Sequence, residues 1–437
     1  MAQLGRVLGS GPRGRAFESR HSDQIFCGES PERRFREKGT LRRAFFRECI
    51  KFFVRRTGVM KMANVGIICE YNPFHNGHAE QLRKADELLG GEHNTKLALM
   101  SGSYVQRGEP AILSKELRTR AALSCGVDLV FEYPFPYSCA PAKIFADCAV
   151  GMFDRLGCVD YLCFGSETGD AGVLSECADV ISSDAFEKAL SEDISDFYGK
   201  MSYAAVRERV YKRLTGNNLP IGSNDILAVE YLIALKKRGS KIKPLVIKRV
   251  SGFGATAARK RIMENEPTTD LLPEIMSGLI AENKTVQIDD FSKTLLPFLR
   301  LSDPERLAVF ADMSYDLACK LVKASMRQTS VSALVECAAN KTYTRARIRR
   351  AIFLSFFGVT PDRLHAEPKS IRLLGANECG RKLLRQISEC SEIEVVTTAR
   401  ASDDISDSND FSLVADSVYA LVSGENRDVF DKKPLLM

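Results

Sequence analysis

Two histidines, three residues apart, are the part of the sequence best suited to chemistry. His75 and His78 flank Asn76 and Gly77, a spacing that places both imidazoles on one face of the first turn of a helix. Gly77 has no side chain, so a phosphate group can approach the backbone where the N–H groups of a helix N-terminus attract anions. Two imidazoles beside an α-phosphate can donate hydrogen bonds as negative charge builds during attack. The motif therefore predicts a site for a triphosphate.

The same motif has plainer interpretations. A histidine near a helix start is often a cap or a surface residue, and paired histidines also occur in metal sites, although the HExxH spacing of zinc proteases is absent. The position of the motif favours nucleotide binding. Residues 62–69 have the pattern of a buried strand and residues 77–89 that of an amphipathic helix, and open α/β sheets bind ligands at such a junction.

The elements that must position the histidines form an alternating series. Strand-like runs are expected at residues 62–69, 96–102, 127–134, 160–167 and 243–250, and helices near 77–89, 114–125, 141–156, 171–190, 203–214 and 224–238. Strands that alternate with helices are typical of parallel βαβ units. We therefore predict an α/β fold with a Rossmann-like open parallel sheet over residues 62–254. Strand patterns fade after residue 250, so residues 255–437 are expected to form a mostly α-helical C-terminal domain.

The composition excludes several classes of protein. Of the 437 residues, 45% are hydrophobic and 27% are charged, which is near the average for globular proteins, and no apolar run is long enough to predict a membrane span. The 13 cysteines are an odd number and form no CxxC pair, so neither a disulfide framework nor a structural zinc site is expected. A reduced, cytoplasmic protein fits this composition.

The positive charge of the chain lies in its N-terminal leader, residues 1–61. Residues 1–62 carry 15 Lys and Arg against 6 Asp and Glu, whereas the net charge of the whole chain is +6, so the remainder is slightly acidic. The leader can be a basic arm that binds RNA phosphates, or an organellar targeting segment, against which its acidic residues count. The plainest interpretation is a disordered or artefactual extension, with translation starting at Met60 or Met62.

Longer strings around the histidines resemble one enzyme family. The sequence HNGH at 75–78 is similar to the HxGH motif of the nucleotidylyltransferase superfamily. Several strings, in order along the chain, resemble sequences of the tRNA(Met) cytidine acetate ligases: EYNPFHNGH, SGSYVQRGEPAILSK, VDLVFEYPFPYS, FGSE, SNDILAVEYL and IKR. The resemblance implies a Rossmann-type catalytic domain followed by an α-helical domain. It also implies that ATP and acetate form acetyl-adenylate, whose acetyl group passes to N4 of the wobble cytidine of elongator tRNA(Met).

The resemblance also implies an ATP site. Its residues would be Ile68, Cys69, Glu70, Tyr71, Asn72, Pro73, Phe74, His75, Asn76, Gly77, His78, Ala79, Glu80 and Gln81, completed by Gly165, Asn224 and Arg249. His75 and His78 are the expected catalytic residues, and Mg²⁺ is expected to accompany ATP without protein ligands. Gly165 leaves room at a strand end, Asn224 is also a candidate helix N-cap, and Arg249 ends a strand on the ligand side.

Four further residues are candidate phosphate contacts: Lys115, Arg118, Thr256 and Arg259. Lys115 and Arg118 lie three apart on a helical pattern, so they can share one phosphate or simply a solvated face. The string GATAAR at 254–259 stands where the family has Ser-Ala-Thr-x-Ile-Arg, so the first hydroxyl is missing while Thr256 and Arg259 are kept.

Two basic clusters in the helical region are candidates for tRNA contact. They comprise Arg345, Arg349 and Arg350 within 342–358, and Arg381 and Lys382 within 370–387. The three arginines fall largely on one helical face, and cations along the backbone commonly hold RNA. The plain alternative is a solvated amphipathic helix.

Two other functions fit parts of the sequence. A small-molecule adenylyltransferase would share the HxGH motif, but such chains are usually a single short domain. A catalytically silent RNA-binding protein of the same fold is disfavoured by the intact His75 and His78 and slightly favoured by Gly254. The expected partners are ATP, acetate and tRNA, with neither a membrane nor DNA.

Overall fold

The structure is a computed structural model that describes residues 62–90, 94–197, 201–219, 222, 225–249, 252, 254–397, 408–424 and 432–437. Residues 61–437 form one compact unit. The predictions about the leader, residues 1–61, lie outside the described residues, as does the predicted nucleotide ligand Asn224.

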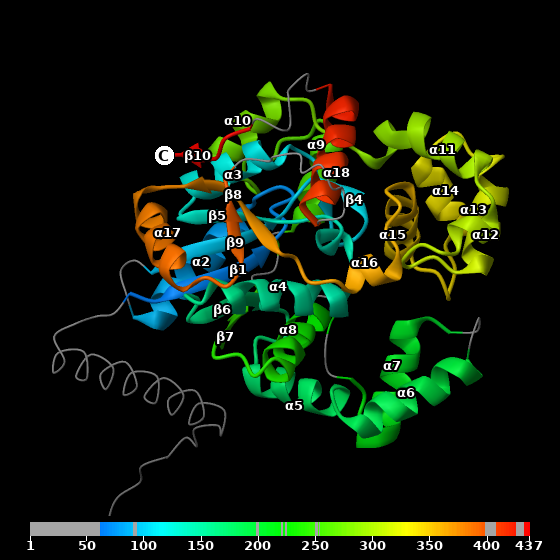
Figure 1. Ribbon diagram of the computed structural model, residues 1–437, viewed down its shortest axis with the longest axis horizontal. Coiled ribbons are helices and arrows are strands. Elements are labelled where there is room, and N and C mark those ends of the chain that lie inside the picture. The colour runs from blue at the N-terminus through cyan, green and yellow to red at the C-terminus, as the bar shows by residue number, and fades with distance from the viewer. Residues whose placement is uncertain are drawn as a thin grey trace, which may run out of the picture. The chain divides into compact units, whose positions relative to one another are not determined.

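A mostly parallel sheet forms the centre of this unit (Figure 1), with the strand order β10-β8-β5-β2-β1-β6-β7. The parallel strands are β1 (Asn64–Cys69), β2 (Thr95–Ser101), β5 (Leu129–Tyr133), β6 (Tyr161–Ser166) and β7 (Lys243–Lys248). All five predicted strands are confirmed. The order reverses at β1, with β2 and β5 on one side and β6 and β7 on the other. Open α/β sheets bind ligands at such a switch point.

Three strands of the C-terminal region were not predicted. They are β8 (Ser370–Ala376), β9 (Glu394–Val396) and β10 (Leu435–Leu436). β8 runs antiparallel to β5, while β9 and β10 run parallel to β8, so the sheet is mixed rather than wholly parallel. β9 and β10 have only 3 and 2 residues. β8 has 7 residues, as many as β2, but it follows a series of helical patterns, and a buried run of this length cannot be told from part of a buried helix by its pattern.

The predicted helices of the first region are confirmed, except that one of them is two. They are α2 (Asn76–Leu89), α3 (Lys115–Ser124), α4 (Ala142–Leu156), α5 (Ala171–Ile181), α6 (Asp184–Asp196), α7 (Tyr203–Thr215) and α8 (Asp225–Lys237). The expected helix over 171–190 divides because Ser183 caps α6, its hydroxyl accepting a hydrogen bond from the Phe186 N–H. The core on one face of the sheet includes residues of α2 and α3, and the core on the other face includes residues of α4 and α8.

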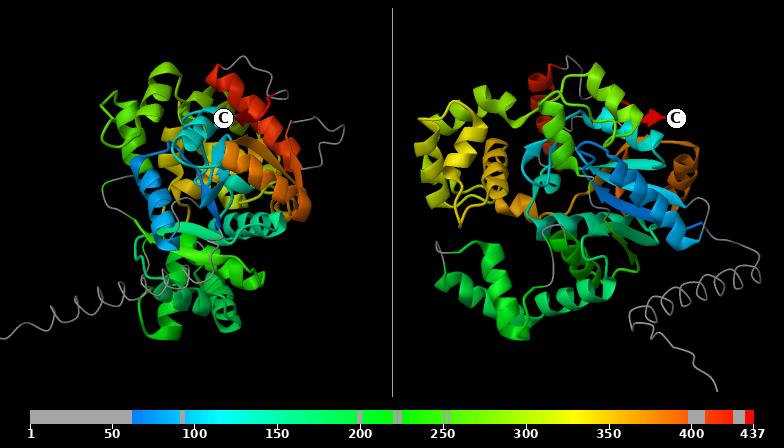
Figure 2. Two further views of the ribbon diagram at one scale, coloured as in Figure 1. Left: turned by 90° about the vertical axis from the view of Figure 1, so that its left-hand side faces the viewer. Right: turned by 180° about the vertical axis from the view of Figure 1, so that it is seen from behind.

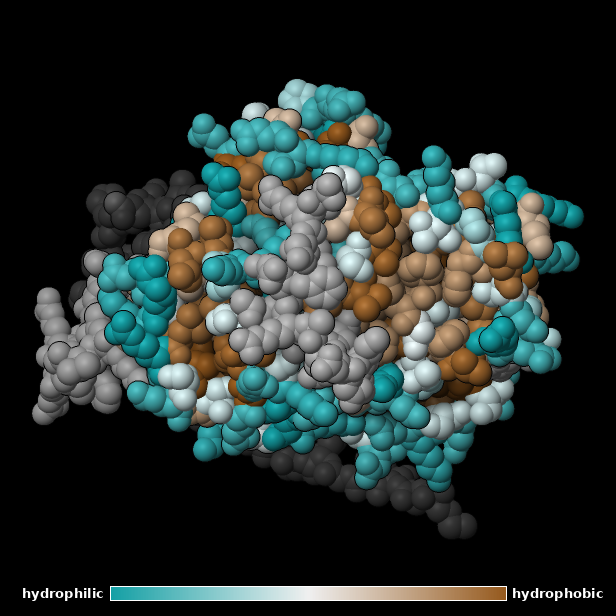
Figure 3. Space-filling view, turned by 45° about the horizontal axis from the view of Figure 1, so that its top comes forward, coloured by the Kyte–Doolittle hydropathy of each residue, from teal (hydrophilic) through white to brown (hydrophobic). Residues whose placement is uncertain are grey.

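The C-terminal region is otherwise helical. Its helices are α9 (Ala255–Met263), α10 (Glu274–Glu282), α11 (Ser292–Leu301), α12 (Pro304–Leu307), α13 (Tyr315–Ser325), α14 (Val331–Ala338), α15 (Arg345–Phe356), α16 (Pro361–His365), α17 (Glu378–Cys390) and α18 (Ser408–Ser423). Both views in Figure 2 show α11–α15 grouped together, apart from α5–α7. In the described part of the chain, no helix is long and apolar enough to cross a membrane. Polar and apolar patches alternate on the face in Figure 3.

A short hairpin joins the sheet to the helical group. Its strands are β3 (Tyr104–Val105) and β4 (Glu109–Pro110). The ring of Tyr104 lies 4.8 Å from that of Phe353 on α15, centroid to centroid. At the tip, Gly108 has φ +71, and a Cβ there would lie 2.4 Å from the Arg350 backbone nitrogen. The hairpin therefore packs directly on the backbone of α15, which no other residue type would allow.

A buried group of charged residues anchors α18. The Lys115 ammonium contacts both the Glu132 carboxylate, at 2.7 Å, and Asp416 of α18. Arg372 on β8 lies 3.9 Å from Glu132 and 3.8 Å from Asp416. The Ser103 hydroxyl donates to Asp416 at 2.5 Å. Two cations thus face two carboxylates, and the last helix is tied to the loop that leads into the β3–β4 hairpin.

Candidate active site

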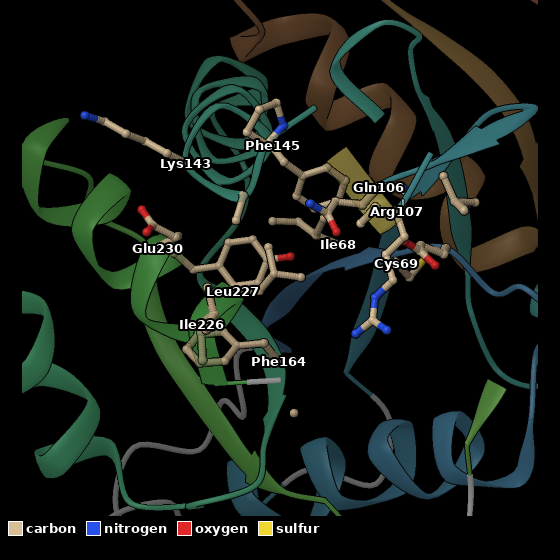
Figure 4. Close-up of a pocket in the computed structure, with 18 of the residues that line it drawn as sticks. Ile68, Cys69, Gln106, Arg107, Lys143, Phe145, Phe164, Ile226, Leu227 and Glu230 are labelled. Atoms are coloured by element: carbon tan, nitrogen blue, oxygen red, sulfur yellow. Dashed lines mark hydrogen bonds between the residues drawn. The ribbon is translucent and has the colours of Figure 1, made fainter. Parts of the chain in front are cut away.

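A cavity of about 1740 Å³ lies at the carboxyl end of β1. It is lined by residues of α2, the β3–β4 hairpin, α4, α7, α8, α9 and α15. In Figure 4, Phe164 and Leu227 lie on one side of it and Cys69, Gln106 and Arg107 on the other. Small-molecule pockets commonly measure about 300–1,000 Å³. The cavity therefore has room for more than a nucleotide.

The two histidines stand together at the start of α2. His75 is the N-cap residue of the helix, and its ring stacks on that of His78 with centroids 3.7 Å apart. The His75 backbone N–H donates to Nδ1 of His78 at 3.2 Å. Because Nδ1 accepts a hydrogen bond, the neutral His78 ring carries its proton on Nε2. That N–H is therefore the one His78 can offer to a ligand.

Both imidazoles are neutral at pH 7. Burial, together with the nearby Arg249 guanidinium, lowers the pKa of His75 to about 4. Burial, His75 and Arg249 hold the pKa of His78 well below its usual value. Two neutral donors, a cation and the N-terminus of a helix converge here. This combination suits a polyanion such as a triphosphate.

Gly165 makes room for Arg249. A Cβ at Gly165 on β6 would lie 3.1 Å from Cγ of Arg249, which follows β7. Both residues line the cavity. From the sequence, Gly165 is expected to leave room at a strand end for the nucleotide. The structure shows that its missing side chain lets the Arg249 side chain pass across the end of β6.

Asp225 fixes the start of α8 to the end of β6. Its buried carboxylate accepts hydrogen bonds from the Ser166 hydroxyl and the Glu167 N–H, both at 2.7 Å. Although burial opposes its charge, these bonds and those from Thr168 hold its pKa below the usual value. The sequence analysis did not single out Asp225, because its partners lie about sixty residues away.

The predicted ATP segment does not line the cavity continuously. Its lining residues are Ile68, Cys69, Glu70, Tyr71, Asn72, His75, Gly77, His78, Glu80 and Gln81. Phe74 instead lies in the core, and the Asn76 side chain donates to the Asp270 carbonyl at 3.0 Å. Pro73 and Ala79 do not line it either. Tyr71 has φ 44, a strained conformation in the tight turn between β1 and α2.

Thr256 and Arg259 both line the cavity at the start of α9. Arg259 donates to the Asn72 carbonyl at 2.8 Å and lies 3.5 Å from the Glu109 carboxylate. Arg349 pairs with the same carboxylate at 3.1 Å. The sequence analysis missed Glu109, since nothing in a two-residue strand indicates that arginines from two distant helices will meet there.

The structure contradicts the prediction that Lys115 and Arg118 contact phosphate. Arg118 is fully buried and donates to the carbonyls of Glu70 at 2.8 Å and Ser101 at 2.9 Å. Lys115 belongs to the buried group that anchors α18, where it pairs with Glu132. Neither lines the cavity. Arg118 instead holds the loop after β1 in place, because it satisfies backbone carbonyls that would otherwise be buried without partners.

The three arginines of α15 do not share one exposed face, and their contact with tRNA stays a prediction. Arg345 is exposed and pairs with Glu336, whereas Arg349 pairs with Glu109. Arg350 is buried, lies 2.8 Å from Asp312 and lines the cavity. The three arginines have the predicted helical spacing, but packing of α15 against the hairpin covers Arg349 and Arg350 and leaves Arg345 exposed.

The second basic cluster lies on α17. Arg381 and Lys382 are exposed, and Lys382 pairs with Glu378 one turn earlier at 3.0 Å. In the described part of the chain, α17 contributes no residue to the lining of the cavity. Contact between this cluster and tRNA stays a prediction.

The fold and the site define a nucleotidyltransferase of the HIGH class: the family model described as HIGH Nucleotidyl Transferase matches residues 62–432. A tRNA(Met) cytidine acetate ligase of Thermoanaerobacter sp. is 34% identical over 389 residues, 82% of this chain and 95% of that protein. Another, of Syntrophotalea carbinolica, is 36% identical over 360 residues, 77% of this chain and 85% of that protein. The chain belongs to the tRNA(Met) cytidine acetate ligase family.

A solved structure supports the same assignment. The crystal structure of Thermotoga maritima TmcAL bound with alpha-thio ATP matches this fold with a TM-score of 0.78 at 29% sequence identity. The match covers 86% of this chain and 100% of that one. The resemblance and the fold class inferred from the sequence are confirmed.

Proposed function

We propose that this chain is an ATP-dependent ligase that activates acetate as acetyl-adenylate and transfers the acetyl group to N4 of the wobble cytidine of elongator tRNA(Met). The observation that carries the proposal is the convergence of His75, His78 and Arg249 at the N-terminus of α2, inside a cavity larger than a nucleotide needs. The names of the relatives and the ATP analogue bound to the Thermotoga maritima protein support it. We propose a cytoplasmic enzyme, a compartment that supplies both ATP and tRNA.

The site suits the activation step. An acetate oxygen attacks the α-phosphorus of ATP, and pyrophosphate leaves with the electron pair of the broken P–O bond. Negative charge grows on the phosphate oxygens during attack. The Nε2–H of His78 donates to these oxygens, and the Arg249 guanidinium offsets their charge. Because the imidazoles are neutral, they act as hydrogen-bond donors rather than as acids.

Mg²⁺ is proposed to enter with the nucleotide. Within the described residues, no three His, Cys, Asp or Glu side chains are grouped so that they could hold a metal ion. Mg²⁺ is commonly held by substrate phosphates and water with few protein ligands, and the cavity fits that mode. Bound there, it would neutralise charge on the triphosphate.

The source of the acetyl group gives the direct test. We expect labelled acetate, ATP and elongator tRNA(Met) to give labelled N4-acetylcytidine, measured by nucleoside analysis. Initiator tRNA(Met) and tRNA without ATP serve as controls and should remain unlabelled. If label entered from acetyl-coenzyme A in the absence of acetate, or if no acetylcytidine formed, the proposed function would be wrong.

Two cations at the cavity suit the tRNA backbone. Arg107 and Lys143 line the cavity from the hairpin and from α4, are exposed, and form no ion pair with any described residue. Figure 4 shows them on opposite sides of the cavity. We propose that they contact RNA phosphates when the cytidine enters between them.

Replacing both residues with alanine should weaken tRNA binding and lower the slope of log Kd against log salt by about 1.4 to 1.8. Filter binding over a range of salt concentrations measures this slope. The double variant Arg381→Ala/Lys382→Ala removes the same charge from α17 and tests the predicted tRNA contact of that cluster in the same assay. A slope that falls only in the α17 variant would mean that Arg107 and Lys143 do not contact the RNA.

A further inference from the structure

Glu70 holds a fixed position in the lining of the cavity. It follows β1 directly and lines the cavity beside the turn that leads to His75. Its carboxylate accepts a hydrogen bond from the Gln106 N–H at 3.1 Å, and its carbonyl accepts one from Arg118 at 2.8 Å. Arg118 is fully buried. Glu70 is thus held from both ends, by a rigid core residue and by the β3–β4 hairpin.

Ion pairs do not occupy the Glu70 carboxylate. Within the described residues it has no salt-bridge partner, whereas most other carboxylates that line the cavity are paired. Those pairs are Glu80 with Arg83, Glu109 with Arg349, Asp147 and Glu367 with Arg238, Glu230 with Arg207, and Asp312 with Arg350. A carboxylate in a cavity that is positioned but makes no direct ion pair is available to accept a proton.

Glu70 joins the turn after β1 to the hairpin. Gly165 and Arg249 come from β6 and the end of β7, on one side of β1, and His75 and His78 come from the start of the helix after β1. The Glu70 carboxylate instead contacts Gln106, which follows β3 of the separate two-stranded hairpin. Glu70 thus lies where the turn that leads to the histidines meets the hairpin that carries Arg107, and both line the cavity.

Resting on the proposed function, we propose that Glu70 is the base that takes the proton from N4 of the acceptor cytidine during acetyl transfer. The lone pair of this exocyclic amine is delocalised into the ring, so the nitrogen attacks only as its proton is removed. The bond from N4 to the acetyl carbon forms while the bond from that carbon to the phosphate oxygen breaks. AMP leaves with the electron pair, and the N4 proton passes to the Glu70 carboxylate and then to water.

The surroundings of Glu70 strengthen it as a base. Burial raises its pKa, and Glu109 adds to the rise. The rise in the pKa of Glu70 is opposed, without being cancelled, by Arg259, the Gln106 N–H and Arg107. The other titratable groups that face Glu70 are Cys69, Cys139, Tyr231 and Arg118. A raised pKa brings a carboxylate closer to the pH at which a general base works best. Since the charged form is the active one, transfer should rise with pH through the Glu70 pKa, above the ordinary range of glutamate.

The test separates transfer from activation. Enzyme is first loaded with labelled acetyl-adenylate, tRNA is then added, and the single-turnover rate is measured from pH 5 to 8. Glu70→Gln should slow acetyl transfer by about 10²-fold or more. This loss should be at least about tenfold greater than the loss in acetate-dependent ATP–pyrophosphate exchange. The variant should also lose the acidic limb of the pH profile. Glu70→Asp should keep that limb at a reduced rate. The comparison variant Glu109→Gln removes a neighbouring carboxylate that raises the pKa of Glu70, so it should keep the acidic limb and move it to lower pH.

The outcomes distinguish this inference from the proposed function. If Glu70→Gln slowed exchange and transfer equally, or kept the acidic limb, Glu70 would not be the base, while the ligase function would stand. If the unaltered protein formed no acetylcytidine from acetate, ATP and tRNA, the proposed function itself would fail.

Discussion

Replacing His78 with alanine should reduce acetate-dependent ATP–pyrophosphate exchange by about 10²-fold or more, the effect of losing one preorganised donor to a developing charge. The structure fixes the donor in advance. The His75 N–H donates to Nδ1 of His78, so the ring proton of the neutral imidazole is on Nε2, from which it can be donated to a ligand. Stacking on His75 fixes the plane of the ring.

The exchange assay measures this loss with acetate and ATP alone, without tRNA. The chain contains no tryptophan, so circular dichroism is used to show that the variant is folded. Glu87→Ala, on the exposed face of the same helix where Glu87 pairs with Arg83, is the matched control and should exchange normally. A folded His78→Ala variant with a near-native rate would mean that the α-phosphate lies elsewhere in the cavity.

The neutral state of the imidazoles predicts the pH dependence of the same reaction. The pKa of His75 is lowered to about 4 and that of His78 well below its usual value. Both rings therefore keep their neutral, active form as the pH falls through 6.5. The exchange rate should therefore show no inflection near pH 6.5 that is due to either histidine. The pH profiles of the His75→Asn and His78→Asn variants should have the same shape near pH 6.5 as that of the unaltered protein. Such an inflection would show that a protonated histidine matters at neutral pH.

The sequence predicted the parts of this molecule that depend on local pattern. The strand before His75, the turn and the helix after it are encoded by neighbouring residues. So are the five parallel strands, of which β2 and β5 are buried throughout while β7, at the edge of the sheet, is partly exposed. Neighbouring residue types are therefore sufficient to locate the strand, turn and helix that carry the two histidines.

The parts that the sequence did not predict depend on pairing between distant segments. Arg350 looks like a surface cation on a helix until the hairpin and Asp312 cover it. Arg118 has the spacing of a phosphate contact, but its partners are backbone carbonyls that carry no sequence signal. The resemblance alone implies a place for Glu70 near ATP. Only the fold shows that its carboxylate contacts Gln106 and makes no direct ion pair with a described residue.

Replacing Asp416 with asparagine should lower the free energy of unfolding, or of local opening of α18, by about 3–5 kcal/mol, the usual cost of leaving a buried charge without its partner. Asp416 and Glu132 together balance Lys115 and Arg372. Without Asp416, the two cations face a single carboxylate in a part of the protein that water does not reach. Urea unfolding followed by circular dichroism measures the global loss, and amide exchange of α18 measures the local one.

The cause of this loss can be isolated with a second substitution. If uncompensated charge is responsible, Asp416→Asn/Arg372→Met restores one cation against one carboxylate and should recover part of the lost stability, so the two changes should be far from additive. Asp179→Asn, which breaks an exposed pair with Lys236, is the matched control and should cost less than about 1 kcal/mol. Because α18 also holds Ser103 next to the hairpin, a loosened helix should release Gln106 and Glu70 from their fixed positions. Additive losses in the double variant would mean that packing of α18, rather than charge balance, holds the hairpin.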